Sequence, residues 1–137
     1  MAINFSKLEE ITKALKSSKQ TGKCFHTTFA FRGSKLLSIG INNYKKQHPA
    51  RKFGNYVSTK GGGDYVAGIH SEVSSLIKLG MEDCSDITFV NIRVDNNNRL
   101  ANSRPCSNCQ RVLNQIGYKN IWFYDGTTYI KHNNNIN

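Results

Sequence analysis

The sequence predicts an α/β fold of three layers, α-β-α, in which helices cover the two faces of a five-stranded mixed sheet. Segments with apolar residues at helical spacing alternate with segments rich in β-branched and aromatic residues. Glycine-based turn signals separate these segments. The chain has 137 residues, which is the usual length of one domain. We therefore expect residues 1–137 to form a single domain with this architecture.

The first half of the chain predicts a helix, a hairpin and a loop. Apolar residues recur at helical spacing over residues 5–16, which indicates an amphipathic helix. Residues 25–31 and 35–41 have the composition of strands, and Gly33 lies in the short turn between them. Residues 42–66 then form a long polar loop, and loops of this length in compact domains are usually functional or mobile.

The second half predicts two helices and three strands. The helices are expected over residues 68–79 and 106–116, and the strands over residues 87–94, 121–124 and 127–131. Asp125-Gly126 is a hairpin signal, so the last two strands are predicted to be antiparallel. The predicted order of elements is α-β-β-α-β-α-β-β, which makes the sheet mixed.

The net charge of the chain limits the classes of molecule that it is expected to attract. The formal net charge is +10, from 19 Lys+Arg against 9 Asp+Glu. A positive field attracts phosphorylated small molecules or nucleic acid, and a solvated basic surface is the alternative. The sequence holds no apolar run of membrane-spanning length and no apolar secretory segment near Met1, so we expect a cytoplasmic protein without a membrane partner.

The chain has four cysteines, at positions 24, 84, 106 and 109. Because cytoplasmic thiols stay reduced, the close pair Cys106 and Cys109 predicts metal binding or redox activity, not a structural disulfide. The pair stands in Pro105-Cys106-Ser107-Asn108-Cys109, at the start of a predicted helix. Residues three apart on a helix are neighbours, and the positive helix N-terminus favours the thiolate form that binds zinc.

His70 and Glu72 open the other predicted helix of the second half. A catalytic zinc takes three protein ligands and leaves one position for water, so His70, Cys106 and Cys109 form a candidate ligand set. Glu72 lies two residues from His70 and is expected beside the zinc water as the proton carrier. The alternatives are a redox pair, a structural zinc closed by Cys24 or Cys84, and ordinary helix roles for His70 and Glu72.

At these residues the sequence resembles the cytidine and deoxycytidylate deaminase superfamily, whose signature is His-x-Glu followed by Pro-Cys-x-x-Cys. The resemblance extends over roughly residues 24–131. It implies a cytidine deaminase-like fold, one zinc per chain, hydrolytic loss of ammonia with Glu72 as the proton shuttle, and a homo-oligomer. The predicted fifth strand follows a tight turn instead of a helix, which is more similar to the free-nucleoside branch of that family.

Substrate contacts follow from the same resemblance. Gly40-Ile41-Asn42 matches the family's Gly-x-Asn element, with Asn43 as the adjacent competitor and a strand-end turn role as the alternative for Asn42. Asn102 and Ser103 belong to the stretch expected to run along the base. The loop supplies basic side chains that could meet phosphate, or lie solvated: Lys45, Lys46, His48, Arg51 and Lys52.

Three function hypotheses follow. The first is a zinc-dependent deaminase of a cytosine nucleoside or nucleotide. The second is a deaminase of single-stranded DNA or RNA, in which the loop tracks the backbone and its aromatic residues stack on bases: Tyr44, Phe53, Tyr56 and Tyr65. The third is a zinc-stabilised binding module without activity, which does not account for a carboxylate at Glu72. Guanine or another aminated ring also stays open as the substrate.

Overall fold

The computed structural model describes residues 3–19, 25–42, 70–80 and 83–133. Over these residues it has the predicted order of elements. They are α1 (Phe5–Lys19), β1 (Phe25–Arg32), β2 (Lys35–Ile41), α2 (Ser71–Lys78), β3 (Ile87–Val94), α3 (Ser107–Ile116), β4 (Asn120–Tyr124) and β5 (Tyr129–Asn133). No helix in these ranges has the length and apolar character needed to cross a membrane.

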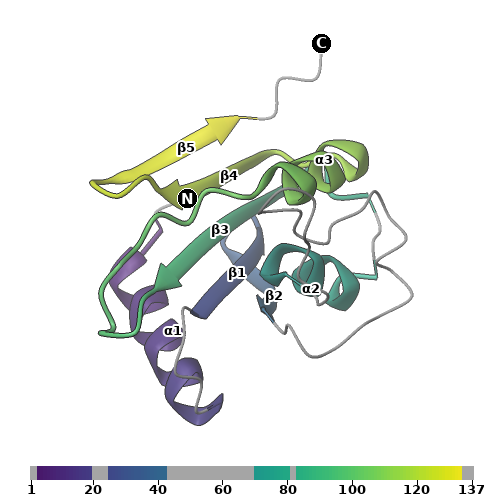
Figure 1. The fold of residues 1–137 in the computed structure, drawn as a ribbon. Helices are drawn as coiled ribbons and strands as arrows, with labels where there is room; N and C mark the ends of the chain where they lie inside the picture. The colour runs from purple at the N-terminus through teal and green to yellow at the C-terminus, as the bar shows by residue number, and fades with distance from the viewer. Residues whose placement is uncertain (1–2, 20–24, 43–69, 81–82, 134–137) are drawn as a thin grey trace.

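The strands form one mixed sheet in the order β2-β1-β3-β4-β5 (Figure 1). β3 and β4 are parallel, and α3 makes the crossover between them. The other three neighbouring pairs are antiparallel, including β4 with β5 as predicted. The predicted α/β fold with a five-stranded mixed sheet between helices is therefore confirmed.

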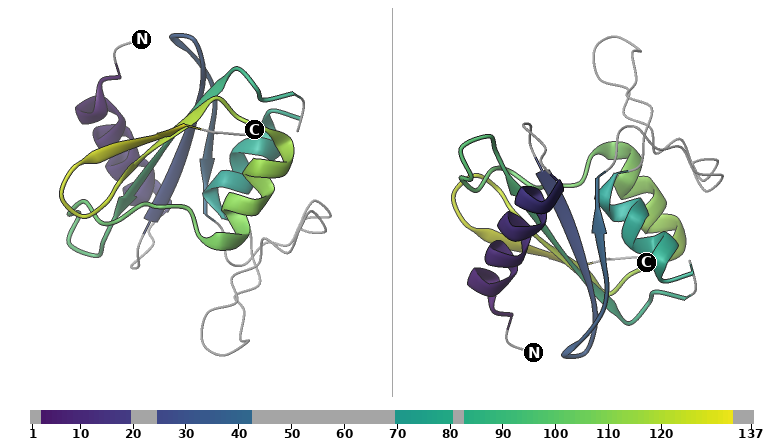
Figure 2. Two further views of the ribbon diagram at one scale, coloured as in Figure 1. Left: turned by 90° about the horizontal axis from the view of Figure 1, so that it is seen from above. Right: turned by 90° about the horizontal axis from the view of Figure 1, so that it is seen from below.

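Of the helices in the described ranges, only α1 lies on one face of the sheet (Figure 2). Phe29 of β1 and Val90 and Ile92 of β3 point to this face and are fully buried against Leu8 of α1. The same face continues to β5, where the ring of Phe5 stacks on Tyr129 with centroids 4.0 Å apart. Alternate residues of β1 and β3 thus supply a mainly apolar surface for the amphipathic first helix.

The opposite face is covered by α2 and α3, which lie side by side (Figure 2). Phe89 of β3 is fully buried in this second core, which also contains Val73 and Leu76 of α2 and Val112 and Leu113 of α3. The apolar cluster extends over only part of the face. Farther along β3, towards its carboxyl end, the residues on this face are the polar Asn91 and Arg93.

Small residues let α2 approach β2 closely. A Cβ added at Gly40 would collide with the backbone O of Ser71 and the backbone N of Ser75, and would lie 2.9 Å from Ser75 Cα. The Ser38 and Ser75 hydroxyls lie 2.7 Å apart across the same contact. Gly40 therefore sets the position of the first turn of α2, which follows His70 directly.

Some predicted boundaries were wrong, for local reasons. α1 runs to Lys19 and not to residue 16, since the Ser18 hydroxyl donates to Leu15 O and keeps the last turn satisfied. Residues 127–128 belong to the last turn and not to β5, because the Asp125 carboxylate accepts both of their backbone N–H groups (2.8 and 2.9 Å). α2 is described from Ser71 and α3 starts at Ser107, so His70 and Cys106 are N-cap residues.

Candidate metal centre and its surroundings

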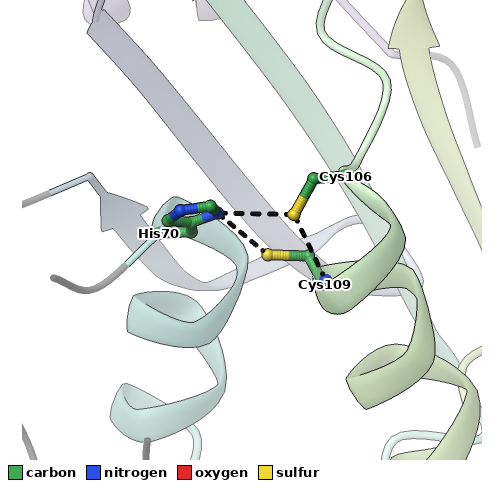
Figure 3. A group of neighbouring side chains, drawn as sticks. All are labelled: His70, Cys106 and Cys109. Atoms are coloured by element: carbon green, nitrogen blue, oxygen red, sulfur yellow. Dashed lines mark hydrogen bonds between the residues drawn. The ribbon is translucent and has the colours of Figure 1, made fainter. Parts of the chain in front are cut away.

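The N-termini of α2 and α3 bring three metal-ligating side chains together (Figure 3). His70 is the N-cap of α2, Cys106 is the N-cap of α3, and Cys109 lies in the first turn of α3. Both caps have extended backbone, as N-caps do, and the Cys106 sulfur accepts the backbone N–H of Cys109 at 3.4 Å. The sequence thus starts each helix with a residue whose side chain points into the space between the two helices.

The three donor atoms have the spacing of a metal site. His70 Nδ1 lies 3.3 Å from Cys109 Sγ and 3.6 Å from Cys106 Sγ, and all three ligand atoms lie within 4.8 Å of one another. Two ligands of a tetrahedral ion with bond lengths near 2.0–2.3 Å are about 3.6 Å apart. Both sulfurs are free thiols. His70, Cys106 and Cys109 can therefore hold a metal ion, as the sequence predicts.

The two thiols of this group have pKa values shifted in opposite directions. The side-chain hydrogen bond from Cys109, helped by His70, lowers the pKa of Cys106 to about 4. The same bond to Cys106 and burial raise the pKa of Cys109 well above its usual value. Burial, the largest single influence, opposes protonation of His70, but the hydrogen bond with Cys106 and the charges of Cys106 and Glu72 together raise the pKa of His70. A cation that replaces these protons would find one thiolate already formed.

Glu72 lies beside this group without belonging to it. Its side chain is 5% exposed. Oε2 accepts a hydrogen bond from Asn91 Nδ2 at 2.9 Å, and Oε1 accepts one from the Ser71 hydroxyl at 3.3 Å. Burial raises the pKa of Glu72, and its hydrogen bonds and His70 offset part of that rise. A buried carboxylate with a raised pKa, next to a metal site, can take up and release a proton.

The sequence did not lead us to predict a role for the polar residues under Glu72. Asn91 of β3 and Thr28 of β1 are cross-strand partners, and both are buried. Thr28 Oγ1 lies 2.7 Å from Asn91 Oδ1 and 2.8 Å from Ser71 Oγ. The signal was present, since Asn91 stands in the otherwise apolar run 89–92 on the same strand face as Phe89. A buried polar residue among apolar ones is more informative than the apolar ones.

Asn42 and His26 lie at the margin of the site. Asn42 Oδ1 accepts the backbone N–H of His26 at 3.0 Å, which gives that oxygen a strand-end role and leaves substrate contact by Asn42 as a prediction. The His26 side chain is on the same strand face as Thr28, and its cross-strand partner is Arg93. Burial, with the charges of Arg93 and His70, lowers the pKa of His26 to about 3.

Ser103 is placed near the site but is engaged within the protein. It is 1% exposed, and its hydroxyl donates to Asn91 O and accepts the backbone N–H of Tyr124, each at 2.8 Å. Asn102 is exposed, and its Oδ1 accepts the backbone N–H of Arg104 at 2.9 Å. Contact between substrate and either residue stays a prediction.

The other predicted site residues lie mostly outside the described ranges. These are Asn43 and the basic and aromatic residues of the loop, including Lys45 and His48. Cys24, one suggested fourth ligand, is outside them as well. Cys84, the other, is buried in the apolar cluster under α2 and α3 and does not belong to the metal-binding group.

No protein-family model, curated protein or solved structure matches this chain. The family resemblance of its sequence therefore stays a prediction, and the function has to be inferred from the site.

Proposed function

We propose that this protein is a zinc-dependent hydrolytic deaminase of a cytosine nucleoside or nucleotide. The observation that carries the proposal is the combination of three converging metal donors with a buried carboxylate held next to them. The donors are His70 Nδ1 and the sulfurs of Cys106 and Cys109. The carboxylate is Glu72, which is not part of the donor group.

The donor set favours zinc. Thiolates and imidazole are the ligands that zinc takes in proteins, and three protein ligands are typical of catalytic zinc sites because they leave a position for water. When bound, zinc lowers the pKa of its water towards about 7 and so makes it a nucleophile at neutral pH. His70, Cys106 and Cys109 would hold the ion.

Glu72 moves the protons of the reaction. It takes one proton from the attacking water and delivers it to the ring nitrogen, while the new C–O bond forms at the carbon that bears the amine. It then carries the second proton to the amine, the C–N bond breaks, and ammonia leaves. The net change is one water consumed and one ammonia released, with the amine replaced by a carbonyl. The raised pKa of Glu72 suits both directions of transfer.

Two observations favour a nucleoside or nucleotide as the substrate. The net charge of +10 attracts phosphate. β5 is antiparallel to β4, which is the arrangement expected for the free-nucleoside branch that the sequence resembles. We therefore place cytidine, deoxycytidine and their monophosphates ahead of single-stranded DNA or RNA and of guanine compounds.

The test is ammonia release from a panel of aminated substrates. We expect the zinc-loaded protein to deaminate cytosine nucleosides or their monophosphates, and removal of zinc by a chelator to abolish turnover until zinc is restored. Turnover of oligonucleotides alone would support the polynucleotide alternative and reject the small substrate. Elemental analysis that finds no zinc in natively purified protein would reject the proposal itself.

A substitution at Glu72 separates catalysis from metal binding. Glu72→Gln keeps the shape of the side chain but cannot carry the proton, so we expect zinc content to stay at one per chain while kcat falls by about 100-fold or more. Glu10→Gln is the matched control, since Glu10 is exposed on α1. A Glu72→Gln protein that loses zinc but keeps its turnover would show that the assigned role is wrong.

A further inference from the structure

The polar residues beneath Glu72 form a closed ring of contacts between three elements. Asn91 of β3 contacts Glu72 Oε2, and Thr28 of β1 contacts both Asn91 and Ser71. Ser71 donates to Glu72 Oε1 and closes the ring. All four residues are at most 5% exposed. The Thr28 and Ser71 hydroxyls have one proton each for their three contacts in this ring, whereas both amide protons of Asn91 have acceptors of their own.

Asn91 is the member with the most bonds to fixed atoms. Its Nδ2 donates to Glu72 Oε2 at 2.9 Å and to Ser103 O at 3.2 Å, which uses both of its protons. Its Oδ1 accepts from Thr28 Oγ1 at 2.7 Å. The reverse orientation of the amide would place Oδ1 against a carboxylate and a carbonyl, both of them acceptors, so the surroundings allow only this orientation.

Asn91 also connects Glu72 to the segment of the chain that precedes the metal donors Cys106 and Cys109. Ser103 receives one bond from Asn91 Nδ2 and returns one from its hydroxyl to Asn91 O. Two residues further on, Pro105 is buried, and Cys106 is the N-cap of α3. The same amide therefore ties the carboxylate on α2 to the segment that positions Cys106.

We propose that Asn91 is a positioning residue, which holds the Glu72 carboxylate in one orientation relative to the metal donors. This inference rests on the proposed function only for its catalytic consequence, since the bonds themselves do not depend on the reaction. Thr28 supports Asn91 from β1, so its loss is expected to have a smaller effect in the same direction.

The first test separates positioning from folding by kinetics. We expect Asn91→Ala to lower kcat by about 10- to 100-fold while KM and zinc content stay near those of the unmodified protein. Thr28→Val should lower kcat less. Thr27→Val is the matched control, because Thr27 directly precedes Thr28 in β1 and is equally buried, and the substitution removes a hydroxyl contact of 2.6 Å to Thr12 on the opposite face. It should leave kcat unchanged.

The second test does not need turnover. In the ¹⁵N-labelled protein, the side-chain amide protons of Asn91 should exchange slowly with solvent and should shift when Glu72 is changed to Ala, with zinc present or absent. A protein without activity on any substrate would count against the proposed function, while these signals would still decide the role of Asn91. An Asn91→Ala protein with unchanged kcat, or Asn91 amide protons that do not respond to Glu72→Ala, would overturn the inference.

Discussion

The two faces of the sheet are built from the same strands but differ in how they are stabilised. On the α1 face, β1 and β3 contribute Phe29, Val90 and Ile92, which are fully buried against an apolar helix stripe. On the α2–α3 face the apolar core stops at Phe89, and the next residue of β3 on that face is Asn91. From Val90 to Val94, β3 is apolar on the α1 face, whereas on the other face it becomes polar at Asn91, where α2 and α3 begin.

The α1 face contributes mainly to the stability of the fold, whereas the α2–α3 face also holds the candidate site. Burying an ionisable or amide side chain costs free energy unless every polar atom finds a partner. On the α2–α3 face the partners are supplied by a ring of contacts, which also fixes the Glu72 carboxylate. On the α1 face most of the burial is apolar and contributes roughly 25 cal/mol per Å² without any requirement on orientation, and the buried hydroxyls of Thr12 and Thr27 pair with each other.

The largest expected effect is the loss of metal from Cys109→Ala. Complete zinc sites bind with about 10–16 kcal/mol, which is a few kcal/mol per ligand, so zinc affinity should fall by roughly 100-fold or more. The fold should remain, because Cys109 is one residue of a large buried cluster. Competition with a chromogenic chelator measures the affinity, and circular dichroism checks the fold.

Cys84→Ala is the matched control for this substitution. Cys84 is 2% exposed and belongs to the same apolar cluster as Cys109, but not to the metal-binding group. It should change the stability by a similar amount and leave the zinc affinity as it was. Equal losses of zinc in the two variants would mean that metal binding depends on core packing and not on these donors.

The next effect concerns the contact between β2 and α2. Gly40→Ala places a methyl group against the backbone of Ser71 and Ser75, which cannot move without shifting the start of α2. We expect the free energy of unfolding of the metal-free protein to fall by about 3 kcal/mol. Because His70 precedes this turn, zinc affinity should also fall, by about 10-fold. Denaturant unfolding and chelator competition measure the two quantities.

A substitution on the α1 face should lower the free energy of unfolding without changing the zinc affinity. Ile92→Ala removes a fully buried side chain and should lower the free energy of unfolding by about 2–5 kcal/mol. Its zinc affinity should stay unchanged, since α1 and its core do not touch the metal donors. A loss of zinc affinity as large as that of Gly40→Ala would show that the two faces are not independent.

The elements of this fold were predictable because their signals are local. Alternate aromatic residues predicted β1, and an apolar, β-branched run predicted β3. The motif residues His70 and Cys106 were expected at helix starts, where they do lie. The convergence of the metal donors followed from placing two helix N-termini on one sheet face. The structure bears out that metal-binding group, while the identity of the metal remains part of the proposal.

The positioning residues were not predictable in the same way, because their role depends on pairs far apart in the sequence. Thr28 and Asn91 meet only through the register of β1 with β3, which no local pattern specifies. The steric need for Gly40 likewise appears only when α2 is placed on β2. A sequence pattern can single out Asn91 as a buried polar residue, but it cannot name Glu72 as its partner.

The smallest expected effect concerns the polar margin of the α2–α3 face and depends on pH. The pKa of His26 is lowered to about 3 in the folded protein by burial and by the charges of Arg93 and His70. The unfolded chain takes up this proton near pH 6.5, so between these two values protonation favours the unfolded state. The stability contributed by neutral His26 is present above pH 6.5 and is lost as the pH falls towards 3.

His26→Gln should therefore reduce the pH dependence of stability in this window. One proton changes the free energy of unfolding by at most about 1.4 kcal/mol per pH unit, so the slope of the metal-free protein should decrease by about 1 kcal/mol per pH unit. Denaturant unfolding at several values from pH 4 to pH 7 measures it. His132→Gln is the control, since His132 is exposed on β5 and its loss should leave the slope as it is. If His26→Gln keeps the full slope, as His132→Gln should, the fold does not hold His26 neutral. Burial of His26 beside the metal donors would then cost less stability than this prediction assumes.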